Sequence, residues 1–148
     1  MKQHTTLAAI GLALILLSAC NKDKKEIETN AFGYLQATGN YMIDEAMPYA
    51  TKETRETTLA FLKDNLIPMT PQEVLDANTP ATIAINGITI DNDTAYVSYT
   101  KTTPIKTLEN QIRLVKEEGH WLVYVPLVLP DTMTPGNVTA SLSKADKE

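Results

Sequence analysis

Cysteine and histidine are the scarcest of the residues that could do chemistry in this chain. Cys20 is the one cysteine among 148 residues, and the two histidines are His4 and His120. A single cysteine cannot form an internal disulfide, and an exported free thiol would be open to oxidation. Zinc prefers sulfur and imidazole ligands, so a zinc site here would have to consist almost wholly of carboxylates. We therefore expect no transition-metal centre and no cofactor.

Acid–base catalysis would need a base facing an oxyanion stabiliser, for example a carboxylate opposite a tyrosine. The C-terminal half of the chain offers one set of such polar groups: Tyr96, Tyr99, Tyr124 and His120. The carboxylates fall in expected turns or on a solvated helix face: Asp91, Asp93, Glu117, Glu118, Asp44 and Glu45. Those positions are typical of solvated charge, and a lone histidine at a hairpin is typically an exposed turn residue. The sequence predicts no catalytic residue and a protein that is not an enzyme.

The large aromatic side chains have simpler interpretations as core residues. Trp121 could stack on a sugar, but it is in phase with Val123 and Val125, which favours a place in the core. Three tyrosines of the N-terminal half could either rim a pocket or cap the core with their hydroxyls in water: Tyr34, Tyr41 and Tyr49.

The N-terminus has the layout of an export signal. Lys2 gives a positive start, and an apolar run extends from Leu7 to Leu17. The run is shorter than the roughly 20 apolar residues that cross a bilayer. Residues 1–19 are therefore predicted to be a signal peptide.

The residues Leu17-Ser18-Ala19-Cys20 resemble the lipobox of bacterial lipoproteins, a leucine and two small residues before cysteine. The resemblance implies diacylglycerol on the Cys20 thiol, cleavage between Ala19 and Cys20, and acylation, for example with palmitate, of the new amino group. Two or three acyl chains would hold the protein firmly on a membrane. The alternative is an ordinary secretory cleavage that leaves Cys20 a free thiol.

The residues after Cys20 bear on location and reach. Inner-membrane lipoproteins of enterobacteria typically carry Asp at the next position, so Asn21 favours the outer membrane, with the side that the domain faces left open. Residues 20–25 are expected to be the lipidated cysteine and a short tether, whose five residues after Cys20 reach about 17 Å when extended. Residues 20–148 hold 12 of the 13 basic and all 18 acidic side chains, a net charge of −6. They suit one domain and exclude general attraction to nucleic acid.

Helical periodicity dominates the first half of the expected domain, residues 26–127. The spacing of apolar residues predicts a helix over 26–38 that stops at Gly39-Asn40, and a short one over 41–47 before Pro48. A longer helix is expected over 52–66, with Thr51 as N-cap and Leu59, Leu62 and Leu66 on one side. A capping box at Thr70-Pro71-Gln72-Glu73 predicts a last helix that ends near Ala77.

After Pro80 the pattern alternates, as in strands. Ile83 and Ile85 share a phase that Ile88 and Ile90 do not, so we expect a β-bulge at Gly87. Further strands are expected over 94–100, 106–116 and 120–125, the last two joined by a hairpin turn at Glu117-Glu118-Gly119. This order predicts an α+β domain with N-terminal helices packed on a curved antiparallel sheet of about four strands.

Four stretches carry a resemblance to nuclear-transport-factor-2-like domains of the cystatin-like cone fold, in the uncharacterised type found in bacterial lipoproteins. They are Ala31 to Tyr41, Ala46 to Thr51, Ile88 to Tyr99 and Leu114 to Val123. The resemblance implies a sheet curled into a cone, often with an apolar pocket and often with a second copy packed through the sheet. It implies no single function, because related domains include isomerases, dehydratases and binding modules.

The last stretch, residues 128–148, loses periodicity and is expected to be an irregular tail. Within it Asp131-Thr132-Met133 resembles the sites at which Bacteroidota O-glycosylate exported proteins, which makes Thr132 a candidate; Asp93-Thr94-Ala95 also matches.

Three functions remain open from the sequence. The leading one is a membrane-tethered, non-catalytic binding or scaffold module of the cell envelope, with a second copy or another envelope protein as partner. The alternatives are a small-molecule carrier that uses an apolar cone, and a lyase or isomerase in the same cone.

Overall fold

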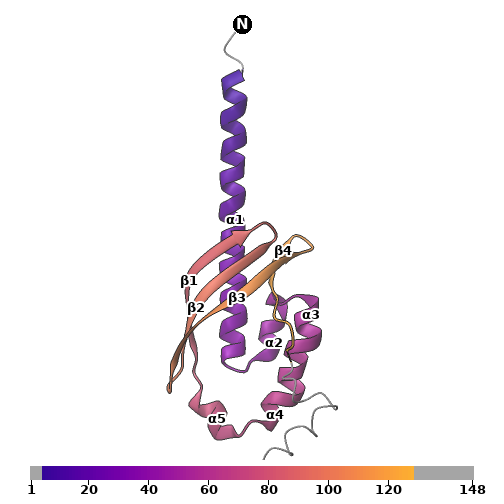
Figure 1. Ribbon diagram of the computed structural model, residues 1–148, viewed down its shortest axis with the longest axis vertical. Helices are drawn as coiled ribbons and strands as arrows, with labels where there is room; N and C mark the ends of the chain where they lie inside the picture. Colours follow the sequence, from indigo (N-terminus) through magenta and orange to yellow (C-terminus); the bar gives the residue numbers. More distant parts are fainter. Residues whose placement is uncertain (1–4, 129–148) are drawn as a thin grey trace, which may run out of the picture.

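The computed structural model describes the backbone of residues 5–128 and the side chains of residues 21–128 (Figure 1). Its helical segments are α1 (Thr5–Gly39), α2 (Ile43–Ala46), η1 (Met47–Tyr49), α3 (Lys52–Thr54), η2 (Arg55–Leu59), η3 (Leu62–Leu66), α4 (Ile67–Met69) and α5 (Gln72–Ala77). Its strands are β1 (Thr82–Asp91), β2 (Thr94–Thr102), β3 (Thr107–Glu117) and β4 (His120–Val123).

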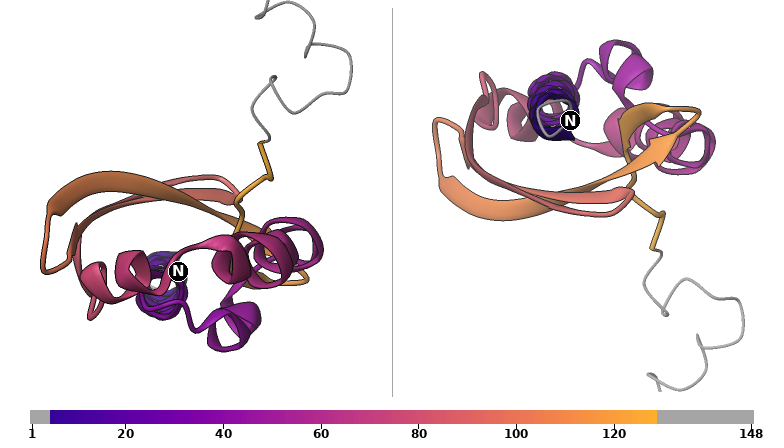
Figure 2. Two further views of the ribbon diagram at one scale, coloured as in Figure 1. Left: turned by 90° about the horizontal axis from the view of Figure 1, so that it is seen from below. Right: turned by 90° about the horizontal axis from the view of Figure 1, so that it is seen from above.

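The strands form one antiparallel sheet in the order β1-β2-β3-β4. Figure 2 shows that the sheet is curved and that all the helices lie on its concave side. This arrangement confirms the predicted α+β class. The hairpin turn between β3 and β4 places Glu118 and Gly119 at φ 51° and 84°, and glycine adopts such angles without strain.

The predicted bulge in β1 is present. The register of β1 against β2 shifts between Ile85 and Gly87, so that Ile85 faces Tyr99 and Ile88 faces Val97. The extra residue returns Ile88 to the concave side, where it packs on the core with Ile83 and Ile85.

Helix α1 begins earlier than the sequence predicted. Residues 21–25, expected to be a short tether outside the domain, are helical and continuous with the part of α1 that packs on the sheet. The reason is tertiary, because Asp23 already forms an ion pair with Lys116 of β3. Cys20 is therefore joined to the domain by continuous helix, and the rise of an α-helix sets the distance between them.

The C-terminal end of α1 lies where the sequence predicted. Gly39 is the last helical residue, and Tyr41 has a positive φ of 61°. The Met42 N–H donates to the Ala37 carbonyl, which closes a Schellman-type end around Tyr41. Gly39 is needed for close packing, since a Cβ there would lie 3.2 Å from the Ala81 Cβ.

The segment from Lys52 to Met69 is longer than predicted. Thr51 caps it as expected, its hydroxyl accepting a hydrogen bond from the Thr54 N–H at 3.2 Å. The helix widens to π geometry in η2 and η3 and continues past the predicted end at Leu66. Leu59 is fully buried, but Leu66 is 48% exposed and does not join the core as expected.

The short helix predicted over 41–47 is present as α2, which ends at Ala46, before Pro48 as expected. Pro48 lies in the 3-10 turn η1 that follows, where a proline near the start costs no hydrogen bond. The capping box predicted at Thr70 does not form. Pro71 takes the N-cap position of α5, and the Thr70 hydroxyl instead donates to the Leu66 carbonyl at 2.7 Å. Helix α5 does end at Ala77, as predicted.

The core lies between the concave face of the sheet and the helices. Its fully buried members of largest volume come from α1, η2 and three strands: Trp121, Ile27, Leu59, Leu114, Val97 and Val123. A threonine series on the helix also faces the core. The last strand was predicted to reach Val125 but ends at Val123. The backbone of Val125 is hydrogen-bonded to the helix instead, its N–H to the Thr54 hydroxyl and its carbonyl to the Thr58 hydroxyl.

Candidate functional site

The carboxylates considered in the sequence lie on the surface, as expected for solvated charge. Asp44, on α2, forms an ion pair with Lys63 of η3, and Glu117 accepts a hydrogen bond from the Lys52 N–H. The others are exposed: Glu45, Asp91, Asp93 and Glu118. Among residues 21–128, no carboxylate is buried and no three His, Cys, Asp or Glu side chains are grouped to hold a metal ion.

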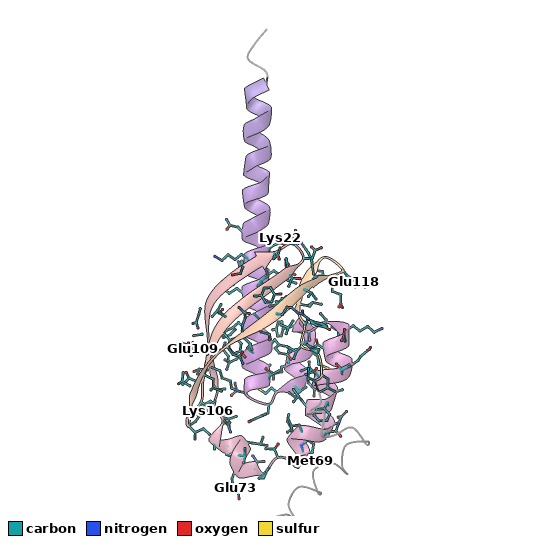
Figure 3. The ribbon with its side chains drawn as sticks, in the orientation of Figure 1. Lys22, Met69, Glu73, Lys106, Glu109 and Glu118 are labelled. Atoms are coloured by element: carbon teal, nitrogen blue, oxygen red, sulfur yellow. The ribbon has the colours of Figure 1, made fainter. Side chains whose placement is uncertain are left out.

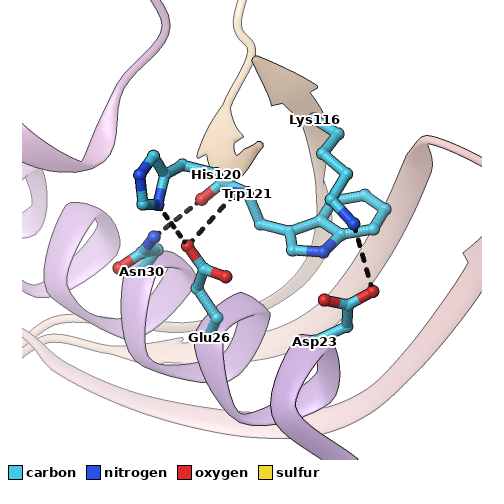
Figure 4. A network of polar contacts seen from close by, with 6 residues as sticks. All are labelled: Asp23, Glu26, Asn30, Lys116, His120 and Trp121. Carbon is cyan, nitrogen blue, oxygen red and sulfur yellow. Dashed lines mark hydrogen bonds and ion pairs between the residues drawn. The ribbon is translucent and has the colours of Figure 1, made fainter. Parts of the chain in front are cut away.

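His120 lies at the corner where the β3–β4 hairpin meets α1 (Figure 4). Its ring is 73% exposed, and Nδ1 lies 3.1 Å from Oε1 of Glu26. The same oxygen accepts the Trp121 N–H, and the Asn30 side-chain amide donates to the Trp121 carbonyl at 2.7 Å. Glu26 and Asn30 thus hold the start of β4 against α1, which is a structural role.

Trp121 is a core residue, 1% exposed, as its phase predicted. Lys116 lies above its ring, with Nζ 5.4 Å from the centroid, and pairs with Asp23 at 3.3 Å (Figure 4). The indole Nε1 has no acceptor in the described part of the chain. A surface depression of about 370 Å³ lies at this corner, lined by Lys22, Lys25, Glu26, Thr29, Asn30, Gly119 and His120.

Two of the three tyrosines of the helical half line pockets, one of the roles that the sequence left open. Tyr34 takes neither role, because it is wholly buried in the core. Tyr41 lines a pocket of about 180 Å³ between the end of α1 and the η3–α4 helix, and Tyr49 lines one of about 290 Å³ beside Phe32. The Tyr49 ring lies directly against Gly33, within 2.5 Å of where a Cβ would be.

The tyrosines of the sheet lie on both of its faces. Tyr96 is exposed on the convex face. Tyr124 donates to Oε1 of Glu53 at 3.2 Å, and the Arg113 guanidinium stacks on its ring 4.4 Å from the centroid. This carboxylate is exposed, so the pair lacks the burial that would tune an acid–base couple. Tyr99 faces the concave side, opposite Ile85 and Asn110.

The concave face is left uncovered at one end of the sheet. Along β2 the inward-facing Ala95 and Val97 are fully buried, whereas Tyr99 and Lys101 are only half-buried. Along β3 the inward-facing Leu114 and Ile112 are buried, but the next two positions of the same phase are exposed: Asn110 and Leu108. We call Tyr99, Lys101, Leu108 and Asn110 the open end of the sheet.

The open end is far from Cys20. Figure 3 places Lys22 and Glu118 at one end of the domain and Lys106, Met69 and Glu73 at the other. Helix α1 runs along this long axis (Figure 1), and its 19-residue path from Cys20 to Gly39 corresponds to about 29 Å. Lys101 lies beside Gly39, its Nζ 3.7 Å from where a Cβ would be.

The electrostatics of the open end favour hydrogen-bond donors. Burial, with a smaller contribution from Tyr99, raises the pKa of Tyr34 to about 12. Burial also raises the pKa of Tyr99, so both phenols keep their protons at neutral pH. Burial lowers the pKa of Lys101, and the positive charge of Lys106 lowers it further. Lys101 forms no ion pair with any described residue.

Sequence reasoning missed Lys101. The signal was its phase, since Ala95, Val97, Tyr99 and Lys101 all point to the concave side of β2. A lysine at an inward position of an alternating strand is unusual, because burial without a counter-charge is costly.

The residues of the predicted modifications are only in part described. Ala19 and Cys20 lie in α1, whose backbone is helical there, and nothing is described of their side chains. Thr132 lies outside the described residues, whereas Thr94, at the start of β2, is half-buried. Between residues 5 and 128, no helix combines the length and the hydropathy needed to cross a bilayer.

Comparison with known proteins adds a structural likeness. No family model matches the sequence, and no curated protein matches it. Among solved structures, the chain is similar to an NTF-2 like protein of unknown function from Shewanella oneidensis MR-1. The two are 15% identical, the match covers 68% of this chain and 93% of the other, and the TM-score is 0.46. The α+β class rests on the strand order and helix placement described above.

Proposed function

We propose that this chain is a lipid-anchored protein of the cell envelope whose α+β domain, of the nuclear-transport-factor-2-like type, is a non-catalytic binding module. The lipobox-like Leu17-Ser18-Ala19-Cys20 supports the anchor, and Asn21 supports the outer membrane. The four stretches of sequence resemblance support the domain type.

The observation that carries the proposal is the helix that joins Cys20 to the domain. The first tertiary contact, from Asp23 to Lys116, comes three residues after Cys20. At the rise of an α-helix this is about 4.5 Å, much less than the extended tether would allow. A lipid on Cys20 would hold the hairpin corner close to the membrane and turn the open end of the sheet away from it.

The open end supports binding rather than catalysis. The side chains that β2 and β3 present there are phenol, ammonium, amide and leucine, and Glu109, between Leu108 and Asn110, points to the convex side. A general base of the isomerase kind needs a carboxylate or a neutral imidazole among these groups. The uncovered concave face also favours the second candidate, a small-molecule carrier.

Membrane fractionation with metabolic labelling by a palmitate analogue tests the anchor. Wild type should be labelled and sediment with the envelope, whereas Cys20→Ala should be unlabelled and either released or unprocessed. Ser18→Gly keeps a small residue at its position and is the matched control, expected to behave as wild type. An unlabelled wild type, or Cys20→Ala that stays in the membrane in processed form, would refute the proposal.

A further inference from the structure

Lys101, at the open end of the sheet, forms no ion pair with any residue of the described chain. Lys101 is half-buried, it lies against the end of α1 at Gly39, and its neighbours across the sheet are Ile83 and Leu108. The protein as a whole is acidic, with a net charge of −5, so unpaired carboxylates are plentiful elsewhere. A half-buried ammonium without a counter-ion is costly, and such groups concentrate at functional sites.

Helix α1 offers Lys101 no carboxylate, only the partial negative charge of its C-terminal end. Three of its last carbonyl groups already accept hydrogen bonds: Ala37 and Thr38 from backbone N–H groups, and Gln36 from the Asn40 side-chain amide at 2.8 Å. No carboxylate lies near enough to counter the downward shift in the pKa of Lys101. The three ammonium protons are therefore available to an anion that comes from outside.

The surroundings of Lys101 define the rest of such a ligand. Tyr99, two residues before it on the same face, keeps a phenolic proton to donate, and Asn110 faces Tyr99 from β3. Leu108 is 48% exposed although it faces the concave side. Other exposed apolar side chains lie at the same end of the molecule, such as Met69 on α4 (Figure 3) and Ile105 in the turn before β3.

We propose that the open end of the sheet binds an apolar molecule that carries a single carboxylate, of the fatty-acid kind, with the carboxylate on Lys101 and Tyr99 and the chain on Leu108. This inference rests on one part of the proposed function, namely that the domain is a binding module whose binding surface is the open end. It is independent of the anchor on Cys20.

The test is an NMR titration of the full chain, in phosphatidylcholine nanodiscs, with octanoate labelled with ¹³C at the carboxylate. Octanoate should bind, whereas octanamide, its neutral counterpart, and acetate, its head group without the chain, should bind at least about tenfold more weakly. A charge-assisted contact of this kind is worth at least one factor of ten in affinity. Equal binding of octanoate and octanamide, or no binding of octanoate, would overturn the proposal.

Two variants distinguish octanoate bound at Lys101 from octanoate that has partitioned into the nanodisc lipid. Lys101→Met keeps the length of the side chain without its charge, and it should weaken octanoate binding at least about tenfold. Lys24→Met, an exposed lysine at the anchor end of α1, is the matched control and should bind as wild type. Binding by Lys101→Met at the wild-type affinity would overturn the proposal.

Leu108→Glu is a second variant that tests the same site if Lys101→Met does not fold. It places a carboxylate opposite Lys101 at an exposed position, so it should compete with octanoate and abolish its binding. Retained binding in this variant would count against Lys101 as the anion site. If the Cys20 experiment fails while octanoate binding depends on Lys101, only the anchor is refuted.

Discussion

The side chain of Asn40 is hydrogen-bonded to both backbone groups of Ala81. Its Oδ1 accepts the Ala81 N–H at 2.8 Å, and its Nδ2 donates to the Ala81 carbonyl at 3.1 Å. The two residues are 41 positions apart, and together they fix the end of α1 to the start of β1. This contact sets where the sheet begins relative to the helix that crosses it.

Asn40→Ala should therefore lower the free energy of unfolding by about 1 to 3 kcal/mol, because it leaves the buried Ala81 N–H without an acceptor, although the Ala81 carbonyl keeps the hydrogen bond from the Gln36 side chain. Urea unfolding followed by the fluorescence of Trp121 measures the loss. Asn86→Ala, which removes an exposed contact to Thr100, is the control and should change stability by less than about 0.5 kcal/mol. Equal effects of the two variants would contradict the role given to Asn40.

Thr54→Val should destabilise the protein by about 1 to 3 kcal/mol, since it preserves shape but removes the acceptor of the Val125 N–H. Thermal unfolding reports the effect. Thr57→Val lies one turn further along the same helix and loses only an exposed bond to the Glu53 carbonyl, so it should be nearly neutral. If Thr57→Val were as damaging as Thr54→Val, the loss would reflect helix propensity rather than the link to Val125.

Tyr34 should make stability fall at alkaline pH. Its pKa is raised from 10.0 to about 12 by burial, so the folded state holds the phenolic proton more tightly than the unfolded state does. The stabilising contribution is complete below pH 10 and is lost as pH rises from 10 to about 12, a change of about 2 to 3 kcal/mol. Urea unfolding across this range should show the loss in wild type and a smaller loss in Tyr34→Phe.

The corresponding control is Tyr96→Phe, which removes a hydroxyl from the exposed convex face. It should keep the wild-type dependence on pH. A slope that Tyr34→Phe leaves unchanged would assign the alkaline loss to other groups.

Lys101→Met should raise the midpoint of urea unfolding or leave it unchanged. This is unusual, because most substitutions of partly buried residues lower the stability of the folded state. The burial that lowers the pKa of Lys101 disfavours its charged form, and methionine does not carry that charge. Lys24→Met provides the baseline for removing one positive charge from an acidic protein. A clear fall in the midpoint for Lys101→Met alone would show that the ammonium stabilises the fold.

The sequence by itself determined the strands and most of the helices. Alternation located all four strands and the bulge between Ile85 and Gly87, and helical spacing located the part of α1 that packs on the sheet. These features depend on the local period of apolar residues, which a linear sequence displays directly. The chemistry expected of Cys20 likewise depends on its neighbours in the chain, and it stays a prediction.

Only the tertiary structure decided where α1 joins the domain and the nature of the open end. Residues 21–25 are helical, and Asp23 among them pairs with Lys116, a residue distant in sequence. Lys101 and Leu108 form one surface because the register of β2 and β3 pairs them, and they are uncovered because the helices that bury Val97 and Leu114 leave that end of the concave face open. Which part of a sheet is covered by helices depends on how segments distant in sequence pack together, and the local pattern of apolar residues does not show this.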